Sequence, residues 1–96
     1  MDRQKDSYRQ YMIGQLQLWE SKIAHLKNGA RKYDGSSRIA YENHLRELER
    51  CNRAVFGRYA DLLLAEDRYW EERRLALDAA ARRMDEMLID FSMQRA

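Results

Sequence analysis

The chain has 96 residues, of which 35% are charged, with no proline and a single cysteine. This length fits one small domain over residues 1–96, and a composition poor in β-branched residues favours helices over strands. A lone cysteine excludes an internal disulfide and a zinc site built from cysteines. The net charge of +2, from 18 basic and 16 acidic residues, is too small to indicate nucleic-acid binding.

The N-terminal stretch predicts a helix whose apolar residues recur in alternating steps of four and three. This spacing is typical of a packing seam, by which we mean the row of side chains that a helix buries against its neighbour. Because Trp19 lies within the row, we expect it to be buried, with its indole N–H directed to a polar edge. The first row consists of Met12, Leu16, Trp19, Ile23, Leu26, Ala30 and Tyr33.

The middle stretch repeats the same spacing with one polar member, Asn52. A buried polar residue in a seam can set the register or the oligomeric state, whereas a side chain that points sideways is simply hydrated. The sequence leaves these two interpretations of Asn52 open. The second row consists of Tyr41, Leu45, Leu48, Asn52, Val55, Tyr59 and Leu62.

The C-terminal stretch carries a third row, which starts less regularly because it includes Arg73. The aliphatic stem of an arginine can still cover an apolar seam. Leu88 and Ile89 widen the apolar face near the end. A methionine-rich cluster here could bind a partner, but we expect it to be core at the end of the helix. The cluster consists of Met84, Met87, Leu88, Phe91 and Met93. The third row consists of Trp70, Arg73, Leu77, Ala80, Met84, Met87 and Phe91.

The three rows are out of phase with one another. Eleven residues separate Ala30 from Tyr41, and eleven separate Tyr59 from Trp70. Each interval interrupts the seven-residue repeat, either as a stutter in a continuous helix or as a real break.

The first interval predicts a break, because Gly35 suits a left-handed turn just after the first row ends. Ser36 or Ser37 could then accept a hydrogen bond from the first free amides of the next helix. We therefore expect a turn near residues 34–36.

The second interval contains neither glycine nor proline, and although Asp67 could cap a helix, we expect one helix over residues 37–93. That helix would measure on the order of 85 Å, against roughly 45 Å for a helix over residues 4–33. The part of its apolar row that extends beyond the shorter helix would have to be covered by a second chain. The predicted fold is all-α: an antiparallel helical hairpin or coiled coil with a turn near residues 34–36. The alternative is a compact three-helix bundle with a second break near residues 65–67.

Three side chains could carry chemistry, namely His25, His44 and Cys51. The chain lacks the Glu-x-x-His motif of helical di-metal sites. His44 lies seven residues from Cys51, which on a helix is too far for the hydrogen bond that activates a nucleophile. The glycine-rich phosphate-binding motifs and the serine elbow are absent as well. The sequence therefore predicts no enzyme, no catalytic residue, no metal site and no cofactor.

The basic residues are concentrated in the first third of the chain. Residues 1–33 hold seven Lys/Arg against three Asp/Glu, a balance of +4. A basic amphipathic helix with a tryptophan could lie on an anionic membrane surface, but packing against the matching rows in residues 41–91 is favoured. Arginines elsewhere alternate with acidic residues, which predicts solvated ion pairs rather than a nucleic-acid face. The polar N-terminus and the lack of a long apolar run predict a cytoplasmic location.

Three segments together resemble a group of small bacterial coiled-coil proteins of unknown biochemical function: QLQLWESKIAHL, YENHLRELERCNRA and ALDAAARRMDEMLIDF. The group includes cyanobacterial members associated with stress responses. The resemblance covers about residues 12–91. The proteins of this group have a more regular, alanine-rich stretch where this chain has GARKYDGSS. It implies a coiled-coil protein without catalysis. The matching residues are Gln15, Leu16, Trp19, Lys22, Ile23, Leu26, Tyr41, Glu42, Leu45, Leu48, Trp70 and Phe91.

We therefore expect a non-enzymatic structural or protein-interaction protein that self-associates, with a second copy or a helical protein as its partner and no nucleic acid. A stress-related role is implied by the resemblance alone. The alternative function is a reversible membrane-surface binder that uses the basic N-terminal helix. The residues expected to form the seam or interface are Leu16, Trp19, Ile23, Leu26, Leu45, Leu48, Val55, Tyr59, Trp70, Leu77, Met84 and Phe91.

Overall fold

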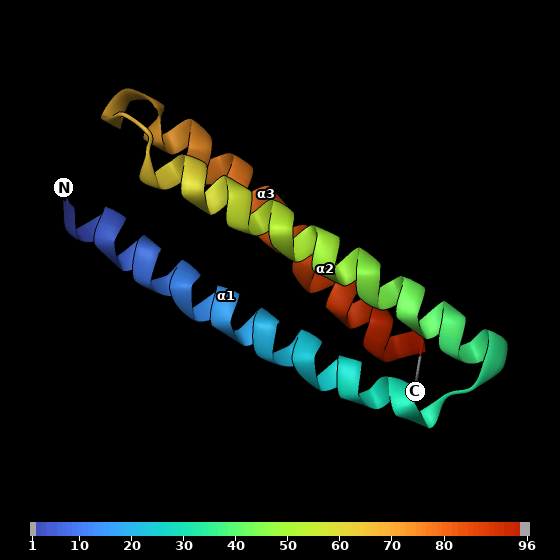
Figure 1. Cartoon of the computed structure of the whole chain (residues 1–96). Helices are drawn as coiled ribbons and strands as arrows, with labels where there is room; N and C mark the ends of the chain where they lie inside the picture. The colour runs from blue at the N-terminus through green and yellow to red at the C-terminus, as the bar shows by residue number, and fades with distance from the viewer. Residues whose placement is uncertain (1, 95–96) are drawn as a thin grey trace.

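The computed structural model describes residues 2–94 and consists of three long helices (Figure 1). Helix α1 covers Asp2–Gly29, α2 covers Gly35–Leu63 and α3 covers Asp67–Gln94, with a single 3₁₀ turn, η1, over Ala30–Lys32. The helices form an elongated bundle whose principal extents are 52 × 19 × 17 Å. The predicted all-α class and the turn between the first two helices are confirmed.

The expectation of one helix over residues 37–93 is wrong, and the alternative three-helix bundle is the arrangement that the structure has. Helix α2 ends at Leu63, and the amide of Ala65 bonds back to the carbonyl of Leu62 at 3.2 Å, three residues earlier. Folding back at this point lays the apolar row of α3 on α2, where Leu77 and Met84 become fully buried. A continuous helix would have left that row in water, at a cost of about 1.5–3 kcal/mol for each large side chain.

Gly35 adopts the predicted left-handed conformation, but it lies at the start of α2 and not at the end of α1. Its φ is +56°, and it is the first residue of α2. Asp34 precedes it in extended conformation and makes no side-chain capping bond, so neither Ser36 nor Ser37 occupies the capping position. Glycine adopts a positive φ without the steric cost that other residues pay, so Gly35 permits the sharp turn of the chain into α2.

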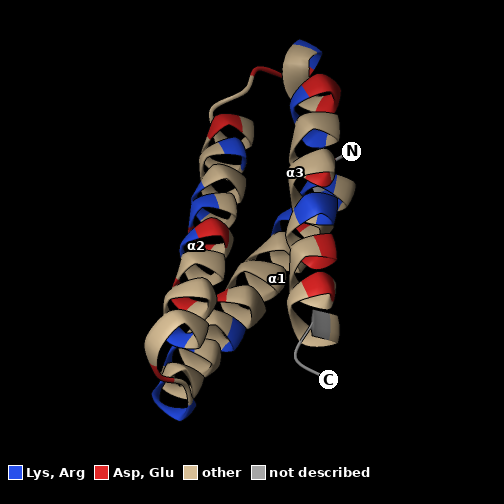
Figure 2. Cartoon of the chain, turned by 90° about the vertical axis from the view of Figure 1, so that its right-hand side faces the viewer, with Lys and Arg blue, Asp and Glu red and all other residues tan. Residues whose placement is uncertain are grey.

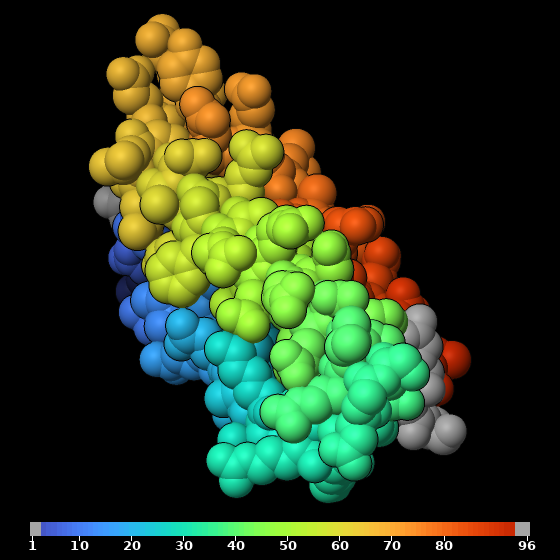
Figure 3. Space-filling model, turned by 45° about the vertical axis from the view of Figure 1, so that its right-hand side comes forward, coloured from blue at the N-terminus to red at the C-terminus, as the bar shows by residue number. Residues whose placement is uncertain are grey.

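Helix α2 packs against both of the other helices, as Figures 1 and 3 show. Helices α1 and α3 run in the same direction, since Lys5 near the start of α1 contacts Asp67 at the start of α3. Within residues 2–94, no Cα atom of α1 lies within 8 Å of a Cα atom of α3. The two parallel helices are therefore held apart, and only long side chains span the distance between them.

The core is one continuous cluster that receives side chains from all three helices. Nine of the twelve residues expected in the seam are buried, and Leu26, Tyr59 and Trp70 are half-buried against the same cluster. Leu88 is buried as expected, whereas Met93 is exposed, so the expectation that it belongs to the core is wrong. Ile89, which widens the apolar face in the sequence, is exposed as well. The buried residues are Met12, Leu16, Trp19, Ile23, Ala30, Tyr41, Leu45, Leu48, Val55, Leu62, Leu77, Met84, Leu88 and Phe91.

The end of α1 is joined to α2 by the hydroxyl of Tyr41, which donates to the backbone carbonyl oxygen of Leu26 at 2.6 Å. The last carbonyls of a helix lack partners within the helix, so this bond satisfies one of them. The hydroxyl reaches that carbonyl across Gly29, where a Cβ atom would lie only 2.8 Å from the Tyr41 oxygen. The absence of a side chain at Gly29 therefore permits the contact.

We predict that Gly29→Ala lowers the free energy of unfolding by about 1 kcal/mol, because the added methyl displaces the Tyr41 hydroxyl and leaves a carbonyl without its partner. Gly14→Ala is the matched control, since a Cβ atom there meets nothing within 4 Å. The control should stabilise the protein by up to about 1 kcal/mol through helix propensity. Urea unfolding measures both. Equal stabilisation by the two variants would contradict the role assigned to Gly29.

Candidate functional site: the groove between α1 and α3

The three side chains that could carry chemistry, His25, His44 and Cys51, do not contact one another. His25 lies on α1, facing α3, whereas His44 on α2 packs edge-on against the ring of Phe91, with 5.8 Å between ring centroids. Cys51 lies between α2 and α3, beside Arg83 and Met87. Among residues 2–94, no group of three histidine, cysteine or carboxylate side chains could hold a metal ion.

Cys51 is half-buried, and its surroundings do not activate it. Burial raises the pKa of its thiol, and the positive charge of Arg83 opposes this only in part. The thiolate is the nucleophilic form of cysteine, so a raised pKa makes Cys51 a poorer nucleophile at neutral pH.

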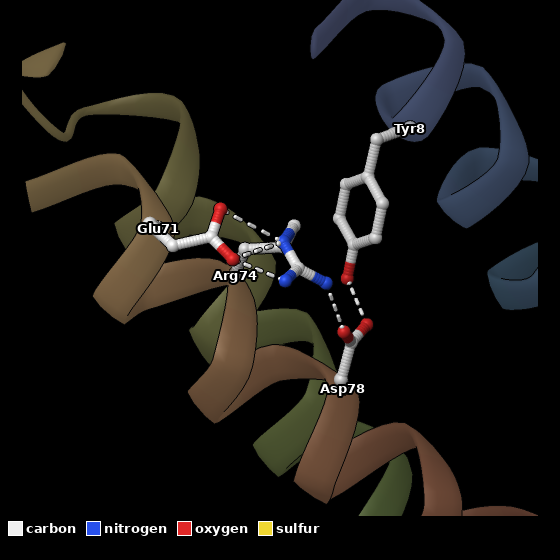
Figure 4. A network of polar contacts seen from close by, with 4 residues as sticks. All are labelled: Tyr8, Glu71, Arg74 and Asp78. Carbon is white, nitrogen blue, oxygen red and sulfur yellow. Dashed lines mark hydrogen bonds and ion pairs between the residues drawn. The ribbon is translucent and has the colours of Figure 1, made fainter. Parts of the chain in front are cut away.

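A polar network ties the first half of α1 to α3 (Figure 4). The hydroxyl of Tyr8 donates to one carboxylate oxygen of Asp78, and Arg74 donates to the other oxygen at 2.6 Å. Arg74 also binds Glu71, one turn earlier on α3. The aromatic ring of Tyr8 meets Trp70 edge to face, with 5.8 Å between centroids. The network thus joins helices whose backbones do not approach each other.

The second connection between these helices is made by Trp19. Its ring is 1% exposed, and its indole N–H donates to Asp85 Oδ1 at 3.0 Å. The sequence predicts that Trp19 is buried with its N–H directed to a polar group, and the structure confirms both. The partner lies 66 residues away in the sequence, so heptad spacing alone could not name it.

Beyond the Trp19–Asp85 contact, the bundle opens into a groove of about 830 Å³ between the second halves of α1 and α3. Its floor is apolar and includes Leu26 and Leu88. Lys22 and His25 stand on the α1 side, and Asp85 stands on the α3 side. We call this feature the α1–α3 groove, and it is lined by Ser21, Lys22, His25, Leu26, Asp85, Leu88, Ile89, Ser92 and Met93.

Large apolar side chains are exposed on the two helices that form the groove. Ile89 and Met93, which line it, are 57% and 71% exposed. Tyr11 and Leu18 on α1 and Leu75 on α3 are exposed as well. Sequence reasoning missed these last three residues because they lie outside the seam rows. Projecting the helices onto a wheel would have placed Tyr11 and Leu18 on one face, because they are seven residues apart.

Three buried polar atoms without a partner lie on α1 or beside it: Arg9 Nε, Asn52 Oδ1 and Trp70 Nε1. Asn52 borders a hollow together with Ile23 and other residues of α1, and Trp70 packs on Tyr8. Asn52 is therefore half-buried at the α1–α2 contact, and its side-chain oxygen gains no hydrogen bond there. The backbone of α1 approaches α2 at fewer points than the backbone of α3 does, so α1 is the less extensively packed helix.

Comparison of the chain with protein-family models, curated protein sequences and solved structures found no match. The resemblance to small bacterial coiled-coil proteins therefore stays a prediction. Within the described part of the chain, no helix is long and apolar enough to cross a lipid bilayer.

The Tyr8–Asp78 bond predicts a dependence of stability on alkaline pH. Burial and the bond to Asp78 raise the pKa of Tyr8 above its ordinary value near 10. Above that pH the unfolded chain loses the phenolic proton while the folded protein keeps it, so the free energy of unfolding falls as pH rises. We expect Tyr8→Phe to cost about 1 kcal/mol at pH 7 and to have a flatter decline between pH 9 and 11.

Thermal or urea unfolding across this pH range measures the effect. Tyr11→Phe is the control, since Tyr11 is exposed on the same helix. A decline of equal slope in the Tyr8→Phe variant and the wild-type protein would show that another group is responsible.

Proposed function

We propose that the chain is a non-enzymatic helical interaction protein that associates with itself. The observation that carries this proposal is the exposed apolar surface along α1 and α3, where the three-helix arrangement leaves one side of the bundle uncovered. Soluble monomers rarely expose large contiguous apolar patches, and such patches mark sites where proteins or membranes bind. The groove could receive apolar side chains from an amphipathic helix.

The chemistry of the groove supports binding rather than catalysis. Catalysis by a nucleophile requires a nucleophile and a base within hydrogen-bond reach, and here His25 lines the groove while Cys51 lies on another side of the bundle. The charged side chains that line the groove are Lys22 and Asp85. They suit a partner surface that carries an acidic group opposite Lys22 and a basic group opposite Asp85.

The charge pattern supports a protein partner over a nucleic acid. Figure 2 shows basic and acidic residues interspersed along α2 and α3. Several arginines are already matched, as with Arg74, which binds both Glu71 and Asp78. Phosphate binding requires basic side chains that are unmatched and gathered on one face. The stress-related role implied by the family resemblance belongs to this proposal as a prediction only.

Self-association is tested by light scattering coupled to size-exclusion chromatography over a hundredfold range of protein concentration. We expect the molar mass to rise from that of the 11.6 kDa chain toward twice that value as concentration increases. A mass that stays at one chain throughout the range would contradict self-association.

A second candidate function, reversible binding to a membrane surface, is favoured by the incomplete packing of α1. If α1 swung away from the bundle, the unpartnered atoms of Arg9, Asn52 and Trp70 could bind water. The row of Met12, Trp19 and neighbouring side chains would then be free to enter a lipid interface.

Flotation with lipid vesicles tests this candidate. A membrane binder should float with vesicles containing anionic lipid, float less at high salt, and remain behind with purely zwitterionic vesicles. Absence of flotation with anionic vesicles at low salt would remove this candidate.

A further inference from the structure

We propose that two copies of the chain pair through the α1–α3 groove about a two-fold axis parallel to the bundle, so that α1 of one copy faces α3 of the other. This inference rests on the proposed self-association and specifies its surface and geometry. A two-fold interface uses the same patch on both copies, so the patch must be complementary to itself. The α1–α3 face, by which we mean the groove together with the exposed Tyr11, Leu18 and Leu75, meets this requirement in apolar content and charge.

The apolar requirement is met because both helices that border the groove expose apolar side chains. Ile89 and Met93 of α3 line the groove, whereas Tyr11 and Leu18 of α1 and Leu75 of α3 are exposed outside its lining. Ile89 and Met93 are four residues apart, which places them on one face of α3. Pairing the two faces would cover these side chains in both copies at once.

The charge requirement is met because the two sides of the groove carry opposite charges. Lys22 lines the α1 side, and Lys32 of η1 lines its continuation beside Tyr33. Asp85 lines the α3 side, where it accepts the N–H of Trp19, and Glu86, the next residue of α3, is exposed outside the groove lining. Arg82, one turn earlier on α3, offsets part of this negative charge. Within the described chain neither Lys22 nor Glu86 has an ion-pair partner, so both are available to a second copy.

The charges also choose between the two possible directions of the axis. An axis perpendicular to the helices would stack α1 on α1 and bring the basic sides together. An axis parallel to the bundle instead sets each basic side on the acidic side of the other copy. Opposite charges placed in this way select the orientation and suppress the wrong one.

The register of α1 on α3 then identifies the residues that meet. The contacts between α1 and α3 join residues 62 to 70 positions apart, from Tyr8–Trp70 to Tyr8–Asp78, so residues at the same height are about 65 positions apart. A two-fold axis along the bundle keeps every residue at its height. Tyr11 therefore comes opposite Leu75 of the second copy, and Lys22 comes opposite Glu86 of the second copy.

The apolar pairing is tested with Leu75→Asp, measured by sedimentation equilibrium. The dissociation constant of the dimer should rise at least tenfold, because two carboxylates enter the interface. Ile39→Asp is the matched control, since Ile39 on α2 is 64% exposed and Leu75 is 57% exposed. The control should leave the constant within twofold of wild type. Circular dichroism confirms that both variants are folded.

The charge pairing is tested by reversal. Lys22→Glu alone and Glu86→Lys alone each place like charges opposite one another twice in the dimer, and each should weaken it on the order of tenfold. The double variant carrying both changes should recover the wild-type constant, and so should an equimolar mixture of the two single variants. Recovery in the double variant and in the mixture is specific to a Lys22–Glu86 contact between copies.

The outcomes separate this inference from the proposed function. A dimer that is insensitive to Leu75→Asp and to both reversals would overturn the pairing proposed here, while self-association would stand. A wild-type chain that is monomeric at all concentrations would overturn both. Weakening by the single reversals without recovery in the double variant would overturn the two-fold geometry.

Discussion

The indole of Trp19 bridges α1 and α3 from within the core, and the position of α1 depends on it. Helices α1 and α3 are both packed on α2, but their backbones stay apart, so the space between them must be filled by long side chains. Trp19 fills it with a buried ring and also reaches Asp85 with its N–H. A smaller side chain would leave a cavity there and an unpaired carboxylate at its edge.

The same separation explains why the bundle is open on one side. Where Tyr8 and Trp19 reach across, α1 is joined to α3 by hydrogen bonds to Asp78 and Asp85. Beyond Trp19, no side chain of α1 makes a hydrogen bond or ion pair to α3 within the described chain, and the groove begins. The hollow between α2 and α3 beside Cys51 is smaller, at about 240 Å³. The exposed groove therefore lies where side chains of α1 no longer bond to α3.

The packing of α1 links the stability of the bundle to the proposed binding of a second copy or a lipid surface. Helix α1 has a smaller backbone contact with α2 than α3 has, and no Cα atom of α1 lies within 8 Å of one of α3 in the described chain. A second copy lying across α1 and α3 would hold α1 in place, and a lipid surface would compete for the same helix. Both proposed functions thus depend on the free energy with which α1 packs.

The sequence by itself determined the helices, the turn before Gly35 and most of the core, because four-three spacing specifies which side of each helix avoids water. It also placed Trp19 in the core with its N–H at a polar edge, since an indole needs both environments. The break at Leu64–Glu66 was decided by tertiary structure. Each residue there accepts a helical conformation, and only the burial of Leu77 and Met84 against α2 favours folding back. The α1–α3 groove likewise could not be predicted, because it arises from the distance between two helices that are not consecutive in the chain.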